Sequence, residues 1–267
     1  MPILELKNVS FKYPSGFEAI TDLNLSFEKG EKVAIIGENG AGKTTTAKLL
    51  NGLLRPTQGA LLLNGKDAVK RTTAQVARDV GYVFQNPDDQ IFNNDVYSEI
   101  IYTPKYYKLS EDEIKRRADK ALKMIHMEKT AHENPYNLSY SLRKFVTIGA
   151  VIAMETEVMI FDEPTAGQDK DGMDTLDSII ETLHQEGKTI LTITHDMEFV
   201  VRNFDRVIVM AHGNVIADGD KRDIFWQHDI LKEAAIHQPY IAQLAHEINM
   251  REHVLDVDEF AARIHKK

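Results

Sequence analysis

The chain has 267 residues, of which 43% are hydrophobic and 27% are charged, a balance typical of globular proteins, and no apolar run approaches the ~18 residues of a membrane span. It contains no cysteine, which excludes disulfides and thiolate metal sites and fits a reducing compartment. The formal net charge of −9 argues against a nucleic-acid binder, which usually presents a basic face, so we expect no nucleic-acid partner.

The first segments of the chain have strand patterns. Residues 3–13, "ILELKNVSFKY", are rich in apolar residues at strand length, and the start of the chain shows no signal-peptide pattern. Residues 32–37, "KVAIIG", form a short apolar run that ends in glycine, which predicts a buried strand. Residues 60–66, "ALLLNGK", predict a further strand, and Asn64-Gly65 is a hairpin-turn signal.

A phosphate-binding loop follows the strand at 32–37. Residues 37–44, "GENGAGKT", fit the pattern G-x-x-x-x-G-K-[ST] between a strand and a helix. The glycines free the backbone to wrap a phosphate with its N–H groups, and the helix N-terminus favours an anion. Lys43 can reach the β- and γ-phosphates and Thr44 can ligate Mg²⁺, whereas the alternative is a glycine-rich turn without a ligand. The predicted nucleotide-binding residues here are Gly37, Glu38, Asn39, Gly40, Ala41, Gly42, Lys43, Thr44 and Thr45.

Helical patterns follow the phosphate loop and fill the middle of the chain. We expect residues 41–54 to form a helix with four leucines on one side. These are Leu49, Leu50, Leu53 and Leu54. The region from about 95 to 155 is mostly helical and looks like an inserted subdomain. Within it, Ser110 and Glu113 have the spacing of a capping box ahead of a helix.

Two carboxylates and a histidine end later apolar strands. Asp162 and Glu163 follow "VMIF", and bare carboxylates at the end of a buried strand need a partner. We expect Asp162 to hold the Mg²⁺ shell and Glu163 to act as general base on a water; the alternative is an acid that caps a helix. His195 ends "ILTIT", at the strand end where ligands bind in parallel sheets; the alternative is a surface histidine.

Strands that alternate with helices predict an α/β fold with a largely parallel sheet. After about residue 228 the chain is helical again. In the tail, one helix face is predicted to carry Ile241, Leu244, Ala245 and Ile248.

The order of these motifs resembles that of an ABC-transporter ATPase subunit. The resemblance covers about residues 3–228 and rests on "GENGAGKT", "VGYVFQ", "NLSYSLRK", "MIFDEPTAGQD" and "THD". It implies a P-loop NTPase fold with a RecA-like parallel core, an antiparallel β-subdomain and a helical subdomain at about 86–155. The remaining residues, 229–267, would form a C-terminal helical segment that serves dimerisation.

The resemblance also implies residue roles. Tyr13 would stack on the adenine ring; the alternative is an exposed aromatic at a strand end. Gln85 would bind Mg²⁺ and report its presence to the helical subdomain. Glu163 would be the catalytic base and His195 would contact the γ-phosphate, with Lys43 and Gln85 completing the catalytic set. Asp169, which ends "AGQD", would lie in the loop that meets a second ATPase.

Within the family, residues 83–92, "VFQNPDDQIF", and the helical tail look like the energy-coupling-factor (ECF) branch and its cobalt and nickel relatives. This resemblance implies ATP and Mg²⁺ as cofactors and import of a vitamin or metal ion. It implies as partners a second ATPase, a transmembrane coupling protein and a membrane substrate-binding protein, with the chain at the cytoplasmic face of the cell membrane. The alternative for residues 86–92 is a solvated turn.

The signature loop, residues 138–142, departs from the family pattern L-S-G-G-Q. Ser139 is kept, but Tyr140 and Ser141 stand at the two glycines and Leu142 at the glutamine. In this family the signature loop completes the pocket of the partner, so the defect would lie in the partner's pocket and cost a few kcal/mol, or ~10²-fold in rate. We therefore expect a heterodimer with one strong hydrolytic site.

Three alternatives remain open at this stage. The altered signature loop can reflect neutral drift at a tolerant position. The chain can be a regulatory subunit that holds ATP with little hydrolysis of its own. It can also be a soluble ABC ATPase that acts on DNA or ribosomes, although it has no basic arms or tandem cassette.

Overall fold

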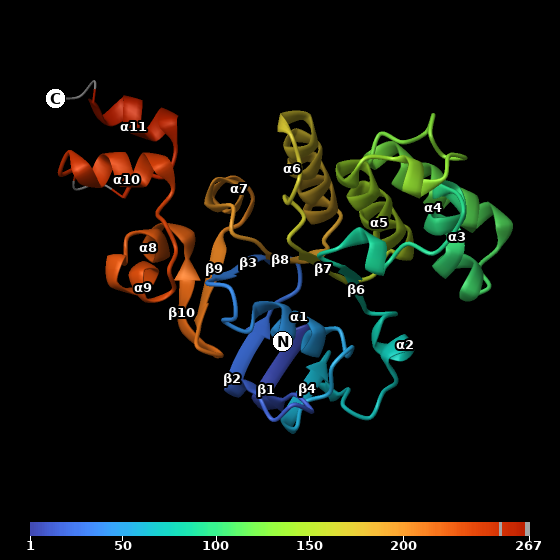
Figure 1. Ribbon diagram of the computed structural model, residues 1–267, viewed down its shortest axis with the longest axis horizontal. Helices are drawn as coiled ribbons and strands as arrows, with labels where there is room; N and C mark the ends of the chain where they lie inside the picture. The colour runs from blue at the N-terminus through green and yellow to red at the C-terminus, as the bar shows by residue number, and fades with distance from the viewer. Residues whose placement is uncertain (251–252, 265–267) are drawn as a thin grey trace.

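The computed structural model describes residues 1–250 and 253–264 and contains two sheets and three groups of helices (Figure 1). The first sheet has the strand order β2-β1-β4-β5 and the second has the order β10-β9-β3-β8-β7-β6. The strands are β1 (Leu4–Lys12), β2 (Glu18–Phe27), β3 (Lys32–Gly37), β4 (Gln58–Leu63), β5 (Lys66–Asp67), β6 (Val80–Val83), β7 (Val158–Asp162), β8 (Thr189–Ile193), β9 (Arg206–Ala211) and β10 (Asn214–Asp220).

The six-stranded sheet is parallel from β9 to β6, and only the edge strand β10 runs antiparallel. Strands β6, β7 and β8 are buried along their whole length, which explains their continuous apolar runs, because helices or the second sheet cover both faces. The predicted strands at 32–37, in "VMIF" and in "ILTIT" are all present, so the predicted α/β P-loop NTPase fold is confirmed.

The antiparallel sheet packs against one face of the parallel sheet with helix α1 (Lys43–Leu50) between them (Figure 1). The predicted hairpin at Asn64-Gly65 joins β4 to β5, and both turn residues have positive φ angles of 48° and 71°. The predicted helix at 41–54 is too long. It ends at Leu50 because Gly52 takes a left-handed conformation with φ 73°, which leaves Leu53 38% exposed.

On the other face of the parallel sheet lie further helices (Figure 1). They are α3 (Val96–Tyr106), α4 (Glu111–Met124), α5 (Tyr140–Met154), α6 (Lys170–Gln185) and α7 (Met197–Asn203). Of these, α3 and α4 pack on α5 rather than on the sheet. Short helices are α2 (Thr73–Val76) and the 3₁₀ turns η1 (Pro87–Asp89) and η2 (Pro135–Asn137). Helices α3 to α5 lie within the range predicted for the helical subdomain.

Helix α4 begins as predicted at Ser110, whose hydroxyl accepts a hydrogen bond of 3.3 Å from the Glu113 N–H. The reciprocal half of the predicted capping box is not made. Instead, the Glu113 carboxylate accepts hydrogen bonds from Arg116 and Arg117, at 2.7 and 2.8 Å, and these guanidiniums lower the pKa of Glu113 to about 2. The Glu113 carboxylate therefore binds the two arginines instead of the N–H group of Ser110, because hydrogen bonds between charged groups are stronger.

The C-terminal segment is helical, as expected. It contains α8 (Lys221–Phe225), α9 (His228–Glu233), α10 (Tyr240–Glu247) and α11 (Val257–Ile264). On the predicted apolar face of α10, Ala245 is buried, whereas Leu244 and Ile248 are 42% and 48% exposed. This face is therefore only partly covered within the chain. In the described part of the chain, no helix is long and apolar enough to cross a membrane.

Candidate active site

Some of the predicted site residues line a cavity of about 280 Å³ beside the phosphate loop, at the carboxyl ends of β3, β6, β7 and β8. The loop contributes main-chain N–H groups and Lys43, β7 contributes Glu163, and the end of β6 leads to Gln85. The complete lining is Phe17, Ala19, Asn39, Gly40, Gly42, Lys43, Thr44, Thr45, Gln85, Glu163 and Ile193.

The phosphate loop requires glycine at two positions for steric reasons. A Cβ atom on Gly37 would lie 2.1 Å from the Met210 carbonyl oxygen on the neighbouring strand, and one on Gly42 would lie 2.7 Å from Ile20 Cδ1. Both glycines also have positive φ angles, 151° and 98°. The loop is therefore pressed against β9 and β2, which holds its N–H groups in one arrangement.

Lys43 lies inside this loop. Its ammonium group donates hydrogen bonds of 2.8 and 2.9 Å to the main-chain oxygens of Gly37 and Glu38, and the side chain is buried. Burial lowers the pKa of Lys43, while the nearby carboxylates of Glu163 and Asp162 raise it. A cation fixed at this depth can contact the terminal phosphates of a bound nucleotide.

Asp162 and Thr44 form a pair of oxygen donors next to Lys43. The Thr44 hydroxyl donates a 3.3 Å hydrogen bond to Asp162, and Asp162 is 1% exposed. Tyr82 donates a 2.6 Å hydrogen bond to the other carboxylate oxygen, which the sequence did not predict. Burial raises the pKa of Asp162, and the hydrogen bonds from Tyr82 and Thr44 act against this increase.

This donor set fits Mg²⁺, which usually takes one or two protein oxygens and completes its shell with phosphates and water. Within residues 1–250 and 253–264, no three His, Cys, Asp or Glu side chains gather to form a protein-only metal site. The predicted ligands Thr44 and Asp162 are in contact, and the third, Gln85, lines the same cavity.

Glu163 has an unusual backbone and a free acceptor. It takes a left-handed conformation with φ 50°, which is uncommon for a side chain of this type and recurs at functional sites. Its Oε2 lies 2.9 Å from Nδ1 of His195 but has no hydrogen bond of good geometry, although the residue is only 7% exposed. Because Glu163 also lines the cavity beside Lys43, its carboxylate can accept a proton from a water bound there.

His195 is exposed on its other side, with 75% of its side chain accessible. One side of the imidazole therefore contacts Glu163 and the other side faces solvent. The position of His195 after β8 predicts that it lies at this end of the sheet. Tyr13 is placed differently: its hydroxyl lies 2.9 Å from the Thr45 hydroxyl, but the ring does not line the cavity. Phe17, an exposed aromatic before β2 that the sequence did not single out, lines it instead.

The signature loop is bound to other loops of the same chain. Ser139 caps α5 and accepts a 3.3 Å hydrogen bond from the Leu142 N–H. Tyr140 donates a 3.3 Å hydrogen bond to the main-chain oxygen of Gln85, and Ser141 donates one of 2.6 Å to the Gln168 side chain. The two side chains that stand at the glycine positions therefore make contacts that glycine cannot make.

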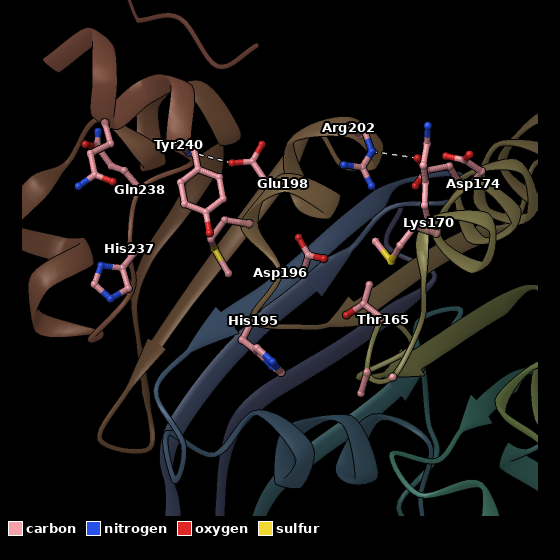
Figure 2. A pocket seen from close by; sticks show the side chains of 16 residues that line it. Thr165, Lys170, Asp174, His195, Asp196, Glu198, Arg202, His237, Gln238 and Tyr240 are labelled. Atoms are coloured by element: carbon pink, nitrogen blue, oxygen red, sulfur yellow. Dashed lines mark hydrogen bonds and ion pairs between the residues drawn. The ribbon is translucent and has the colours of Figure 1, made fainter. Parts of the chain in front are cut away.

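A second, larger cavity of about 1190 Å³ lies on the exposed side of His195 (Figure 2). Figure 2 shows residues of the loop after β7, of α6 and of α7 across from residues of the tail segment before α10. The Tyr240 N–H donates a 2.8 Å hydrogen bond to Glu198, which ties the tail to α7. Asp169 lies at the edge of this region, caps α6 through a 2.9 Å hydrogen bond from Gly172 N–H, and is exposed.

Comparison with known proteins identifies the family. A family model described as "ABC transporter" matches residues 20–166, which include the phosphate loop, the signature loop and Glu163. The chain belongs to the ABC transporter ATPase family. Members of this family are ATP-hydrolysing subunits of transporters, so this ABC ATPase is an ATP-binding enzyme, as predicted from its motifs.

The relatives of this ABC ATPase extend beyond the family match. The chain is 38% identical to a putative ABC transporter ATP-binding protein of Clostridium acetobutylicum, across 98% of its own length and 94% of that protein. It is 36% identical to the energy-coupling factor transporter ATP-binding protein EcfA of Methanocaldococcus jannaschii, across 95% of this chain and 92% of that one. The predicted resemblance to the ECF branch is therefore confirmed.

A solved structure agrees with these sequences. CbiO1 of Clostridium perfringens, described as part of the ABC transporter complex CbiONQ, has a TM-score of 0.78 and 33% identity to this ABC ATPase. The similarity covers 93% of this chain and 99% of CbiO1. The likeness therefore extends well beyond the range of the family match.

Proposed function

We propose that this ABC ATPase energises an ECF-type importer of a vitamin or metal ion from the cytoplasmic face of the cell membrane. The relatives named EcfA and the structural likeness to CbiO1 support this branch. The observation that carries the proposal is a cavity lined by the phosphate loop, Gln85 and Glu163, with Asp162 hydrogen-bonded to Thr44 and His195 next to Glu163.

In the proposed reaction, the N–H groups of residues 38–44 and the Lys43 ammonium bind the phosphates of ATP. Mg²⁺, held by Thr44, Asp162 and Gln85, would neutralise charge on the β- and γ-phosphates. Glu163 orients and deprotonates the attacking water through its free carboxylate oxygen, and His195 binds the γ-phosphate. We propose that Tyr13, whose hydroxyl lies 2.9 Å from the Thr45 hydroxyl next to the phosphate loop, stacks on the adenine ring, while Phe17 lines the cavity itself.

The partners we propose are a second ATPase, a transmembrane coupling protein and a membrane substrate-binding protein. We place the second ATPase against the exposed Asp169 loop, with the C-terminal segment 229–267 contributing to dimerisation. Two features support this placement of the second ATPase. The apolar face of α10 is partly exposed, and a cavity lies between the tail and α7.

We propose further that the dimer is asymmetric. Tyr140 and Ser141 stand where the family has glycines, and both side chains are engaged inside this chain. The signature loop therefore presents side chains rather than a bare backbone to the nucleotide of the partner. The pocket built from Lys43 and Glu163 of this chain keeps all its own groups and would be the strong hydrolytic site.

The test compares two base variants in the assembled transporter. Glu163→Gln in this chain should reduce ATP turnover at least tenfold, whereas the equivalent change in the partner ATPase should reduce it less than twofold. Equal losses from the two changes would contradict the asymmetric dimer. Lys43→Ala tests the proposal as a whole. If this variant still transports substrate, import is not driven by the nucleotide.

A second candidate function is a regulatory subunit that binds ATP with little hydrolysis of its own. The altered residues Tyr140, Ser141 and Leu142 favour it. The free carboxylate oxygen of Glu163 beside His195 favours hydrolysis instead. Single-turnover hydrolysis in the assembled complex separates the two, since the regulatory subunit predicts no loss of turnover from Glu163→Gln.

A further inference from the structure

Lys144 is a fully buried lysine behind Glu163, and none of the roles described above uses it. It lies in the second turn of α5, five residues after Ser139, and its side chain has 0% exposure. Burial lowers the pKa of Lys144 to about 8, even though the carboxylates of Glu163 and Asp162 raise it. Lysine is rarely buried without a specific partner, because burying its charge is costly.

The partner of Lys144 is the backbone of the proposed catalytic base. The Lys144 ammonium group donates a hydrogen bond to the main-chain oxygen of Glu163. On the other side of the same residue, the Glu163 N–H donates a 2.8 Å hydrogen bond to the main-chain oxygen of Ile193 at the end of β8. Glu163 is therefore held at both of its peptide groups, by a strand on one side and by α5 on the other.

This double attachment matters because Glu163 has a conformation that needs support. A left-handed backbone at a residue with a long side chain is disfavoured by roughly 1 kcal/mol or more unless the surroundings hold it. The conformation also sets the direction of the side chain, which brings Oε2 to 2.9 Å from His195 Nδ1. Rotation of the Glu163 peptide would move this oxygen away from the imidazole.

We infer that Lys144 is a positioning residue for Glu163: its ammonium group fixes the main chain of Glu163 and thereby aims the carboxylate at the site of the attacking water. The inference rests on the proposed role of Glu163 as general base. Because Lys144 belongs to α5, it also connects the helix that begins at the signature loop to the base in the pocket of the same chain.

The test uses Lys144→Met in the assembled transporter, because methionine keeps the length of the side chain and removes the ammonium group. We expect kcat for ATP hydrolysis to fall at least tenfold while the KM for Mg-ATP stays within twofold. The Tm should fall only modestly, because the main-chain oxygen of Glu163 loses its hydrogen bond but the chain no longer buries a positive charge. If Lys144→Met lowers the yield of folded protein, Lys144→Arg is compared with it at equal amounts of folded protein. Lys144→Arg should then have the higher kcat, because arginine keeps a cationic donor.

The matched control is Lys188→Met. Lys188 also donates a hydrogen bond from its ammonium group to a main-chain oxygen, that of Glu155 at 2.9 Å, but away from the nucleotide cavity. This variant should keep kcat within twofold of wild type. A loss of kcat as large as that of Lys144→Met would show that the effect is general destabilisation.

A double-variant experiment separates the inference from the proposed function. In a Glu163→Gln background, adding Lys144→Met should change the remaining single-turnover rate less than twofold, because Lys144 acts through Glu163. A further tenfold loss in that background, or wild-type kcat in the single Lys144→Met variant, would overturn the inference alone. Unchanged turnover in Glu163→Gln itself would instead overturn the proposed base.

Discussion

Restoring the family pattern in the signature loop should switch on the weak pocket of the proposed dimer. The perturbation is the triple change Tyr140→Gly, Ser141→Gly and Leu142→Gln, made in a chain that also carries Glu163→Gln. The last change silences the pocket that contains this chain's own phosphate loop. Any hydrolysis that remains then reports the other pocket, which the signature loop of this chain completes.

The cost to stability can be worked from the contacts that disappear. The change removes two hydrogen bonds, of 3.3 Å from Tyr140 to Gln85 and of 2.6 Å from Ser141 to Gln168. At about 1 kcal/mol each, and with a similar total for two glycines in the first turn of α5, the loss is roughly 2–4 kcal/mol. A loss of this size is tolerable for a domain of ordinary stability and should lower the Tm by about 5–15 °C.

The gain in activity should exceed this structural cost. A donor that stabilises developing charge contributes roughly 2.7–4 kcal/mol, or about 10²- to 10³-fold in rate. We therefore expect the triple change to raise the residual turnover of the Glu163→Gln transporter about 10²-fold. The assay is phosphate release from purified transporter at saturating Mg-ATP, at a temperature well below the lowered Tm.

Ser139 supplies the control, because it is the one polar residue of the signature loop that matches the family. Adding Ser139→Ala to the repaired loop should remove most of the gain. A repaired loop that raises turnover less than threefold, in a transporter that is still folded and assembled, would refute the idea that Tyr140 and Ser141 weaken the second pocket.

Further predictions concern the phosphate loop, the metal ligand and the helical region. Gly42→Ala should abolish ATP binding measured by calorimetry, whereas Gly187→Ala, which has a similar positive φ but no atom within 4 Å of its added Cβ, should cost only about 1 kcal/mol in unfolding. Tyr82→Phe removes the hydrogen bond to Asp162 and should change the Mg²⁺ concentration for half-maximal turnover severalfold without changing ATP affinity measured without Mg²⁺. Glu113→Gln should lower the Tm at pH 7. Because the folded-state pKa of Glu113 is depressed to about 2, the difference from wild type should shrink as the pH falls below 4.5 in calorimetric scans.

The parts of the fold that follow from local pattern could be predicted. Strands β3, β7 and β8 are buried on both faces, so their sequences are continuous apolar runs that can be recognised without the structure. Because the carboxyl ends of parallel strands meet at the same edge of the sheet, the polar residues that follow these strands are expected to lie close together in space. Asp162, Glu163 and His195 follow this rule.

The parts that depend on contacts between distant segments could not be predicted. Tyr82 and Asp162 are 80 positions apart in the sequence, and no local pattern around either residue predicts their hydrogen bond. The sequence pattern gives no sign that Lys144 is buried, and only the packing of α5 shows it. The end of α1 was misplaced for a related reason, since the leucine spacing continues past the left-handed Gly52.

The altered signature loop has a physical counterpart inside this chain, which argues against a simple loss of function. Tyr140 packs against the backbone of Gly167, because a Cβ added there would lie 3.0 Å from the tyrosine ring, and its hydroxyl reaches Gln85. Ser141 reaches Gln168 in the same loop. Glycines would remove the hydrogen bonds made by the Tyr140 and Ser141 side chains and leave only the bond from the Gln168 side chain to the main-chain oxygen of residue 141. In the proposed asymmetric dimer, the substitutions exchange close approach to the partner's nucleotide for a firmer link between the signature loop and the loops that flank the pocket of Glu163. A chain whose own pocket is the strong hydrolytic site, as we propose, would gain from that exchange.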